Sequence, residues 1–170
     1  MKGWIAAGSV AALAALATGC GSGKALTVER TTSGPTSTEI FLARSFEANG
    51  REPNFDEKSI FTDRLDERVF KYLREHPEIQ NEDRYSNFRF WHRVSQGSPP
   101  GEVRVLLDEP DERTIDPALM AALASHQWTA ISAKAKEAWV YPLNWIIYFD
   151  DKGVVEMVRR RSQWDKGADD

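Results

Sequence analysis

Few side chains of the sequence stand in a pattern that could support chemistry. The three histidines, His76, His92 and His126, lie in separate segments, and none belongs to a His-Glu-x-x-His motif. Ser125 directly precedes His126 within a predicted helix, where neighbouring side chains point in different directions, so the two cannot act as a dyad. The acidic run at 108–112 is interpreted as a solvated corner between helices. We therefore expect a protein that is not an enzyme and that needs no metal or other cofactor.

Cys20 is the only cysteine of the chain, so it cannot form an intramolecular disulfide. It follows a positively charged start at Lys2, an uncharged and mostly apolar run at residues 4–18, and the small residue Gly19. This order is typical of a secretory signal peptide. The run is too short to span a membrane, which takes roughly 20 apolar residues. Cleavage near Gly19 by an ordinary signal peptidase would leave Cys20 without a role.

Residues 17–20 (Ala-Thr-Gly-Cys) resemble the lipobox of bacterial lipoproteins. There the cysteine becomes the first residue of the mature chain, and its thiol carries a diacylglycerol. Stable anchoring takes more than one acyl chain, which this modification supplies. We therefore predict that residues 1–19 are a lipoprotein signal peptide and that Cys20 is lipidated. Gly21 after the cysteine favours the outer membrane, facing the periplasm, or the cell membrane where the envelope has a single membrane.

Composition indicates one folded domain after the signal peptide. The chain has 170 residues, of which 11% are aromatic and six are tryptophan, enough for a substantial core. A net charge of −4 gives no electrostatic reason to expect nucleic acid as a partner. Residues 20–38 are rich in Gly, Ser and Thr and are predicted to form a flexible tether between lipid and domain. Residues 165–170 are predicted to be a polar tail.

Residues 39–82 are predicted to form a mainly helical extension. Its first part, 39–61, fits either a short helix or an edge strand that ends at Asn49 and Gly50, and the pattern leaves both open. From Asp63 onward apolar residues recur at three- and four-residue spacing, which predicts a helix that Pro77 ends.

Three further helices are expected before the last part of the chain. The first covers 83–94. The second begins at Ser98 and Pro99, which suit the N-cap and first helical position, and buries Val103, Leu106 and Leu107. The third runs from about 116 to 137. Its apolar stripe includes Met120, Trp128 and Ile131, which could be core or a partner-binding surface, and the sequence leaves this open.

The last part is predicted to be β. Strands are expected at 138–141, 145–149 and 154–159, with a tight turn at 150–153 that places Gly153 in the left-handed conformation. Trp145, Ile147 and Phe149 share one face, which should lie against the helices. The predicted fold class is α+β, with helices packed on one face of a three-stranded antiparallel sheet.

Two segments carry a resemblance to a known family. In residues 97–111 a glycine leads into a short helix that ends in an Asp-Glu-Pro corner, and in residues 139–155 an aromatic strand and an apolar strand precede an acidic turn with glycine. Together they resemble the SmpA/OmlA (BamE-like) family of small bacterial outer-membrane lipoproteins. The resemblance covers about residues 83–160. Asp108 stands where that family has glycine, and aspartate tolerates positive φ better than most residues.

The resemblance implies a BamE-like domain at 83–164, in which the helix at 116–137 is an insertion. It implies a non-catalytic, protein-binding scaffold that is accessory to outer-membrane or envelope assembly, with an envelope protein as its partner. The same unit also resembles secreted β-lactamase inhibitor proteins. The alternative is therefore a periplasmic binding or inhibitor module for a secreted enzyme.

Overall fold

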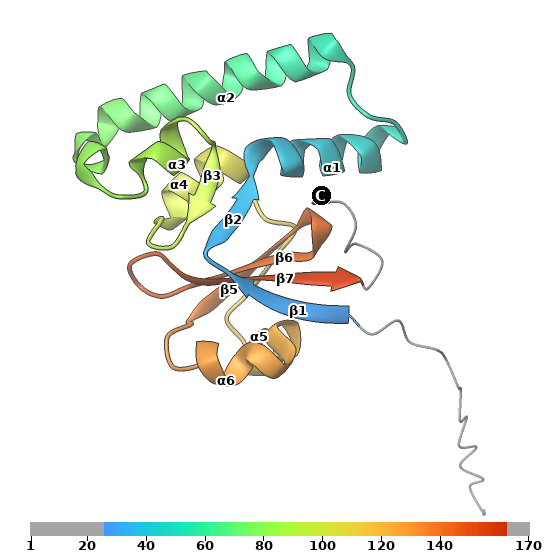
Figure 1. Cartoon of the computed structure of the whole chain (residues 1–170), viewed down its shortest axis with the longest axis vertical. Helices are drawn as coiled ribbons and strands as arrows, with labels where there is room; N and C mark the ends of the chain where they lie inside the picture. The colour runs from blue at the N-terminus through green and yellow to red at the C-terminus, as the bar shows by residue number, and fades with distance from the viewer. Residues whose placement is uncertain (1–25, 163–170) are drawn as a thin grey trace, which may run out of the picture.

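The computed structural model describes residues 26–162 and gives an α+β fold with two sheets (Figure 1). The predicted signal peptide, Cys20 and the polar tail lie outside the described residues. The larger sheet is antiparallel and has five strands in the order β1-β7-β6-β5-β4. The strands are β1 (Leu26–Thr31), β4 (Glu112–Thr114), β5 (Glu137–Tyr141), β6 (Trp145–Phe149) and β7 (Val154–Ser162). The smaller sheet pairs β2 (Ser33–Thr36) with β3 (Arg93–Ser95).

The central meander β5–β6–β7 matches the three predicted strands, but the prediction of a three-stranded sheet is wrong. β4 adds to one edge through pairs such as Arg113 with Trp139, and β1 adds to the other. β4 has only three residues, two of them charged. Short, charged edge strands resist pairing with other chains. A segment of this kind carries almost no hydrophobic pattern, which is why the sequence did not reveal it.

The flexible tether predicted for 20–38 is also corrected from residue 26 onward. β1 pairs along its whole length with β7, from Leu26 opposite Ser162 to Thr31 opposite Met157. Val28 is buried against the sheet. The small polar residues that suggested a linker suit an edge strand, because only one face of β1 meets the core and backbone hydrogen bonds supply most of its contacts.

One face of the sheet is covered by what we call the long-helix layer. It consists of α1 (Ser37–Asn49), α2 (Phe55–Glu75), the short 3-10 helix η1 (Pro77–Asn81), α3 (Tyr85–Arg89) and α4 (Pro100–Leu107). Residues 39–61, which the sequence left open, are thus helical at 39–49 and 55–61, with a connection at 50–54. Thr36 and Asn54 each form a capping box with a glutamate three residues on, Glu39 and Glu57, so both helix starts are fixed locally. Gly50 ends α1 with φ 67°.

The core of this layer lies between the helices and the odd-numbered residues of β6. Trp145, Ile147 and Phe149 all face it, which confirms the predicted inward face. The helices contribute an apolar set that is almost completely buried: Ile40, Leu65, Val69, Phe88, Val103, Leu106 and Leu107.

Two helix predictions in this layer need correction. The helix expected over 83–94 ends at Arg89, because His92 takes a positive φ of 45° and the chain then enters β3. Pro99, not Ser98, is the N-cap of α4, and the helix starts at Pro100. At its other end Asp108 has φ 61° and ψ −162°, a conformation that glycine adopts far more readily than aspartate, so the aspartate at this corner is strained.

The opposite face of the sheet carries a short-helix layer, so the prediction that helices cover one face only is wrong (Figure 1). This layer consists of α5 (Pro117–Ala124), the 3-10 turn η2 (Ser125–Gln127) and α6 (Trp128–Ile131). The single helix expected over 116–137 is broken at Ser125, which has φ 53°. The buried side chains of this layer, such as Ala124, pack on Ile146 and Tyr148, which point away from the long helices.

Gly153 is required for a reason other than the one predicted. Only Gly50 and Gly97 have positive φ among the described glycines. A Cβ on Gly153 would lie 2.8 Å from the carbonyl oxygens of Gly97 and Ser98, so a side chain there would collide with backbone. The turn itself is held by Asp150, whose carboxylate accepts from the backbone N–H groups of Lys152 and Gly153. Gly153 therefore allows the β6–β7 turn to press against the start of α4.

Candidate functional site

The three histidines do not converge. His76 Nδ1 lies 3.2 Å from Glu78, and His92 Nε2 lies 3.4 Å from Oδ1 of Asp66. His126 Nε2 lies 2.9 Å from Nε2 of its neighbour Gln127. Within residues 26–162, no three His, Cys, Asp or Glu side chains are grouped so that they could hold a metal ion.

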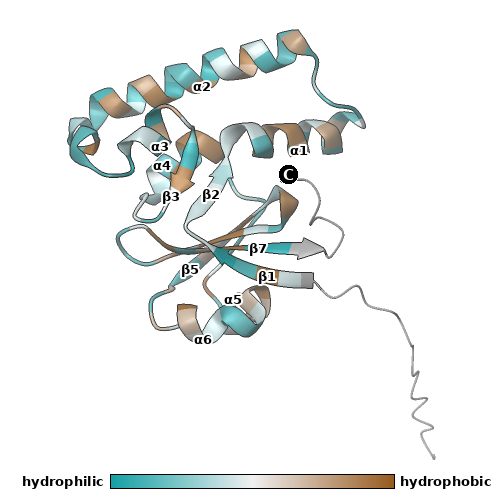
Figure 2. Ribbon diagram, viewed as in Figure 1, coloured by the Kyte–Doolittle hydropathy of each residue, from teal (hydrophilic) through white to brown (hydrophobic). Residues whose placement is uncertain are grey.

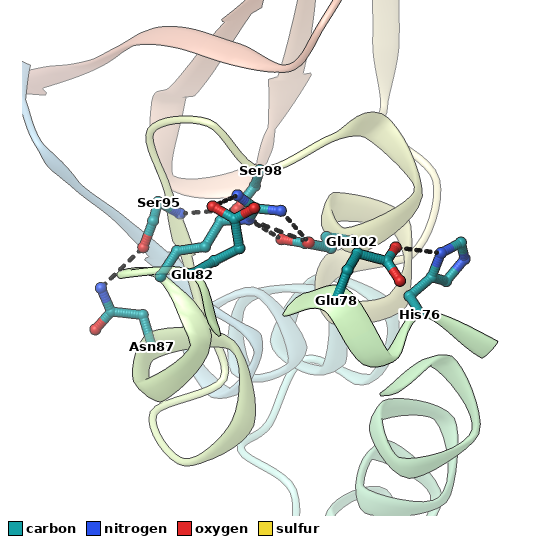
Figure 3. Close-up of polar contacts among 8 residues, drawn as sticks. His76, Glu78, Glu82, Asn87, Ser95, Ser98 and Glu102 are labelled. Carbon is teal, nitrogen blue, oxygen red and sulfur yellow. Dashed lines mark hydrogen bonds and ion pairs between the residues drawn. The ribbon is translucent and has the colours of Figure 1, made fainter. Parts of the chain in front are cut away.

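The most buried polar cluster joins the α3 segment to α4 (Figure 3). The carboxylate of Glu102 is fully buried and accepts hydrogen bonds of 3.0 to 3.1 Å from Nε and Nη2 of Arg84. Nearby, Asn87 donates to the hydroxyl of Ser95, and the backbone N–H of Ser95 donates to the hydroxyl of Ser98. The charges and polar groups satisfy one another, so this cluster fastens two elements together.

Tyr72 of α2 lies beside the Arg84–Glu102 ion pair. Burial raises the pKa of its phenol, and the nearby carboxylate of Glu102 raises it further. A Cβ on Gly101 would lie 2.9 Å from the Tyr72 hydroxyl oxygen, so glycine lets α4 approach α2 closely. Sequence reasoning missed this cluster. Its only local sign is an acidic residue, Glu102, next to the apolar face of α4.

A groove between α1 and α2 has a volume of about 790 Å³. The rings of Phe41 and Phe61 stack at its floor, 4.0 Å apart and nearly parallel. Ile60 lines it with 51% of its surface exposed. Figure 2 shows hydrophobic segments along α1 and at intervals along α2 on either side of this gap. Apolar surface of this extent in a concave site is typical of a binding surface.

The groove lies beside the first half of α2, which is less buried than the second half. Leu65, Val69 and Leu73 are buried against the core, whereas Phe55 in the first turn is 83% exposed. The short connection after Gly50 holds the start of α2 near the end of α1, and the rings of Phe41 and Phe61 bridge the two helices (Figure 1). The first half of α2 therefore overhangs α1.

Two arginines fix the inner wall of the groove. Arg44 of α1 donates to the carbonyl oxygens of Leu107 at 2.8 Å and Glu109 at 2.6 Å, and so satisfies the C-terminal end of α4. Arg68 of α2 pairs with Asp108 at the same end. Cations are favourable there because the helix dipole places partial negative charge at a C-terminus. A recess of about 80 Å³, lined by the side chains of Phe41, Phe61 and Arg44, continues inward from the groove.

The rim of the groove carries both signs of charge. Glu57 is paired with Arg51, and this pairing together with the backbone N–H of Asn54 lowers the pKa of Glu57 to about 2. Arg64 and Glu67 line the rim farther along α2. Such a rim can select a partner and set its orientation, while the apolar floor supplies most of the contact area.

The predicted partner-binding residues lie elsewhere and are core. Met120 and Ile131 are 2% and 1% exposed and pack against the sheet, so they cannot form an accessible surface. Trp128 is partly buried, with its ring 6.2 Å from that of Tyr148. The Tyr148 hydroxyl donates to the backbone carbonyl of Met120, and burial raises the pKa of Tyr148. Cys20, the predicted lipidation site, lies outside the described residues.

The groove residues were not predicted from sequence. One signal was available: residues 39–61 contain more large apolar side chains than one helix face can bury, among them Phe41, Phe46, Phe55, Ile60 and Phe61.

Comparison of the chain with protein-family models, with curated proteins and with solved structures gives no match. No helix among residues 26–162 is both long enough and apolar enough to cross a membrane.

Proposed function

We propose that this protein is a lipid-anchored envelope protein that binds a protein partner in the groove between α1 and α2 and catalyses no reaction. The observation that carries the binding role is the apolar floor of Phe41 and Phe61 inside a groove of about 790 Å³. The anchor rests on the lipobox-like residues that precede Cys20.

An accessory role in outer-membrane or envelope assembly follows from the resemblance to the SmpA/OmlA family. In support, α3 and α4 precede the meander β5–β6–β7 in the element order that this resemblance implies. The strands β1 and β4 and the short-helix layer then extend that unit.

The chemistry of the groove defines the partner segment. A helix or extended peptide with bulky apolar side chains would cover the stacked rings and Ile60. Flanking charges of both signs would meet Arg64 and Glu67 at the rim, where opposite charges add specificity more than affinity.

The groove is tested by site-specific cross-linking in intact cells. A photoactivatable residue replaces Ile60, which is 51% exposed in the groove, and in a control protein it replaces Phe70, which is 47% exposed on α2 but does not line the groove. We expect a defined partner to be captured from position 60 and not from position 70. The Ile60→Asp variant should lose that partner while keeping its melting temperature.

The identity of the captured protein separates the two interpretations of the family resemblance. A component of outer-membrane assembly supports the scaffold role, and a soluble secreted hydrolase supports the inhibitor role. Capture from both positions alike, or from neither, would overturn the groove as the binding site. The anchor is tested separately: a fatty-acid analogue should label the wild type and should not label Cys20→Ala.

A further inference from the structure

One end of the five-stranded sheet gathers the start of β1, the start of β6, and the end of β7. Leu26 lies opposite Ser162, and Trp145 lies opposite both Tyr141 and Arg159. The tip of β5 and the start of β4 complete it, since Glu112 pairs with Val140. We call this the β1-entry end, and Figure 1 shows the start of β1 and the tip of β7 together on that side.

We propose that the β1-entry end lies on the lipid bilayer and that Leu143 and Leu119 insert into the membrane interface. The inference rests on the proposed anchor at Cys20. It adds the orientation of the folded domain and the residues that contact lipid.

Chain length gives the first argument. Six Cα–Cα steps separate Cys20 from Leu26, so the two Cα atoms are at most ~20 Å apart even in a fully extended chain. A lipidated Cys20 lies at the membrane surface, and the polar headgroup layer itself occupies several ångströms of this reach. The domain therefore cannot stand far from the membrane or turn freely on a long linker, as residues 20–38 had suggested. Leu26, at the β1-entry end, is the described residue that the chain holds closest to the anchor.

The turn between β5 and β6 gives the second, independent argument. This turn, η3 (Pro142–Asn144), lies at the β1-entry end and places Leu143 at φ 59° and Asn144 at φ 59°. Asparagine tolerates this conformation, but leucine does not favour it, and a glycine would fit without strain. Leu143 nevertheless is 43% exposed and packs into neither core cluster. A strained, exposed leucine at a turn tip is explained by a contact outside the protein.

Leu119 of α5 presents a second apolar side chain near the same end. It is 55% exposed and lines a recess together with Val140 and Arg160. Arg160 lies on β7 directly opposite Val28, close to the start of β1. An arginine beside an apolar contact suits a membrane interface, because its long stem can lie on apolar surface while the guanidinium reaches the headgroups.

Two leucines cannot hold a protein to a membrane by themselves. They need the anchor, which keeps the domain at high local concentration beside the bilayer, so that a weak contact becomes well populated. The test therefore uses the lipidated full-length chain.

The chain offers a clean labelling scheme because lipidation blocks its only thiol. Leu143→Cys is labelled with an environment-sensitive fluorophore, and the lipidated protein is reconstituted into phosphatidylcholine vesicles that contain doxyl-labelled lipid. The control is Phe90→Cys, because Phe90 is 63% exposed and directly follows α3, and Figure 1 shows α3 on the side of the molecule opposite the start of β1. We expect a blue shift and at least twofold quenching at position 143 and neither at position 90.

A second variant guards against a labelling artefact. Leu143→Gly removes the apolar side chain and relieves the positive φ, so the melting temperature should stay the same or rise. Quenching of a label at Leu119→Cys should nevertheless fall in this variant. Equal quenching at 143 and 90, or none at 143, in protein whose Cys20 carries lipid would overturn the orientation and leave the anchor intact. Absence of fatty-acid label on Cys20 would remove anchor and orientation together, while the groove would still be judged by cross-linking at position 60.

Discussion

The two faces of the main sheet are covered in different ways. The long-helix layer packs four α-helices on large aromatic residues of the sheet, including Trp139, Trp145 and Phe149. The short-helix layer covers the opposite face with two brief helices and small or flexible side chains such as Met120 and Ala124. On the first face the fully buried carboxylate of Glu102 pairs with Arg84, and on the second the buried Glu156 pairs with Arg30, which is 43% exposed.

The two layers therefore contribute differently to the molecule. The long-helix layer holds most of the buried aromatic area and also the groove, which its first two helices leave open. The short-helix layer adds little bulk but is needed because β6 is apolar on both faces: all five of its residues are buried. A strand of this kind has no side that can face water.

The largest effect on stability should come from replacing, one at a time, two tryptophans that face opposite layers. Trp145→Ala should lower the free energy of unfolding by about 3–5 kcal/mol, because its ring is 5% exposed and its loss leaves a large cavity. Trp128→Ala should cost only about 1–2 kcal/mol, because part of that ring already meets solvent. Chemical denaturation of both variants measures the difference. Equal losses would mean that the short-helix layer is as tightly packed as the long-helix layer.

An intermediate effect is expected at the buried ion pair. Arg84→Met leaves the fully buried Glu102 carboxylate without its partner, at a cost of about 3 kcal/mol. The double variant Arg84→Met, Glu102→Leu should recover most of that stability, since an apolar pair replaces an uncompensated charge. Arg51→Met provides a matched control, because the Arg51–Glu57 pair is solvent-exposed and should contribute little. A single variant as stable as the wild type would show that water reaches Glu102.

The smallest effect concerns pH and His92, which lies in the long-helix layer between Asp66 and Arg89. Burial lowers the pKa of His92 below its ordinary value of 6.5, the Arg89 cation lowers it further, and the Asp66 carboxylate opposes both. Below pH 6.5 the unfolded chain therefore binds a proton at His92 more readily than the folded chain does. The contribution of His92 to the free energy of unfolding is fully present above pH 6.5 and is lost as the pH falls from there towards the folded pKa.

His92→Asn should flatten the pH dependence of the melting temperature in that window, and asparagine suits the positive φ of 45°. His126→Asn, on the surface of the short-helix layer, should leave the dependence unchanged. A steeper loss of stability in His92→Asn than in the wild type would reverse the assigned sign.

Sequence patterns predicted the parts of the fold that carry a strong hydrophobic period. The meander β5–β6–β7, the inward face of Trp145 and the buried side of α4 follow from alternation or from helical spacing. The uninterrupted apolar run of β6 also indicates that both faces of the sheet are covered, because none of its residues suits a side that faces water. Gly153 was predicted to be important, yet its reason is a close approach to Gly97 and Ser98, which lie far away in sequence.

The remaining features depend on tertiary contacts that no local pattern encodes. β1 has two apolar residues, Leu26 and the buried Val28, among four polar ones, so its pairing with β7 has almost no sequence signal. The groove arises from the angle between α1 and α2, which is set by Arg44, Arg68 and the packing of α2 on α4. Its floor residues, Phe41 and Phe61, were visible only as apolar residues in excess of those a helix can bury.

The pairing of β1 with β7 also dictates the order in which this chain can fold. Leu26 and Ser162 are the first and last described residues, so their contact has a high loop-closure cost and should form late. Until β1 docks, the outer edge of β7 presents unpaired backbone groups that any other extended chain can bind. If the proposed anchor at Cys20 holds the N-terminal side at a membrane, the first strand lies at a fixed place before the last strand has been synthesised. The interval before the sheet closes is then the period in which this protein is most exposed to aggregation and most dependent on chaperones.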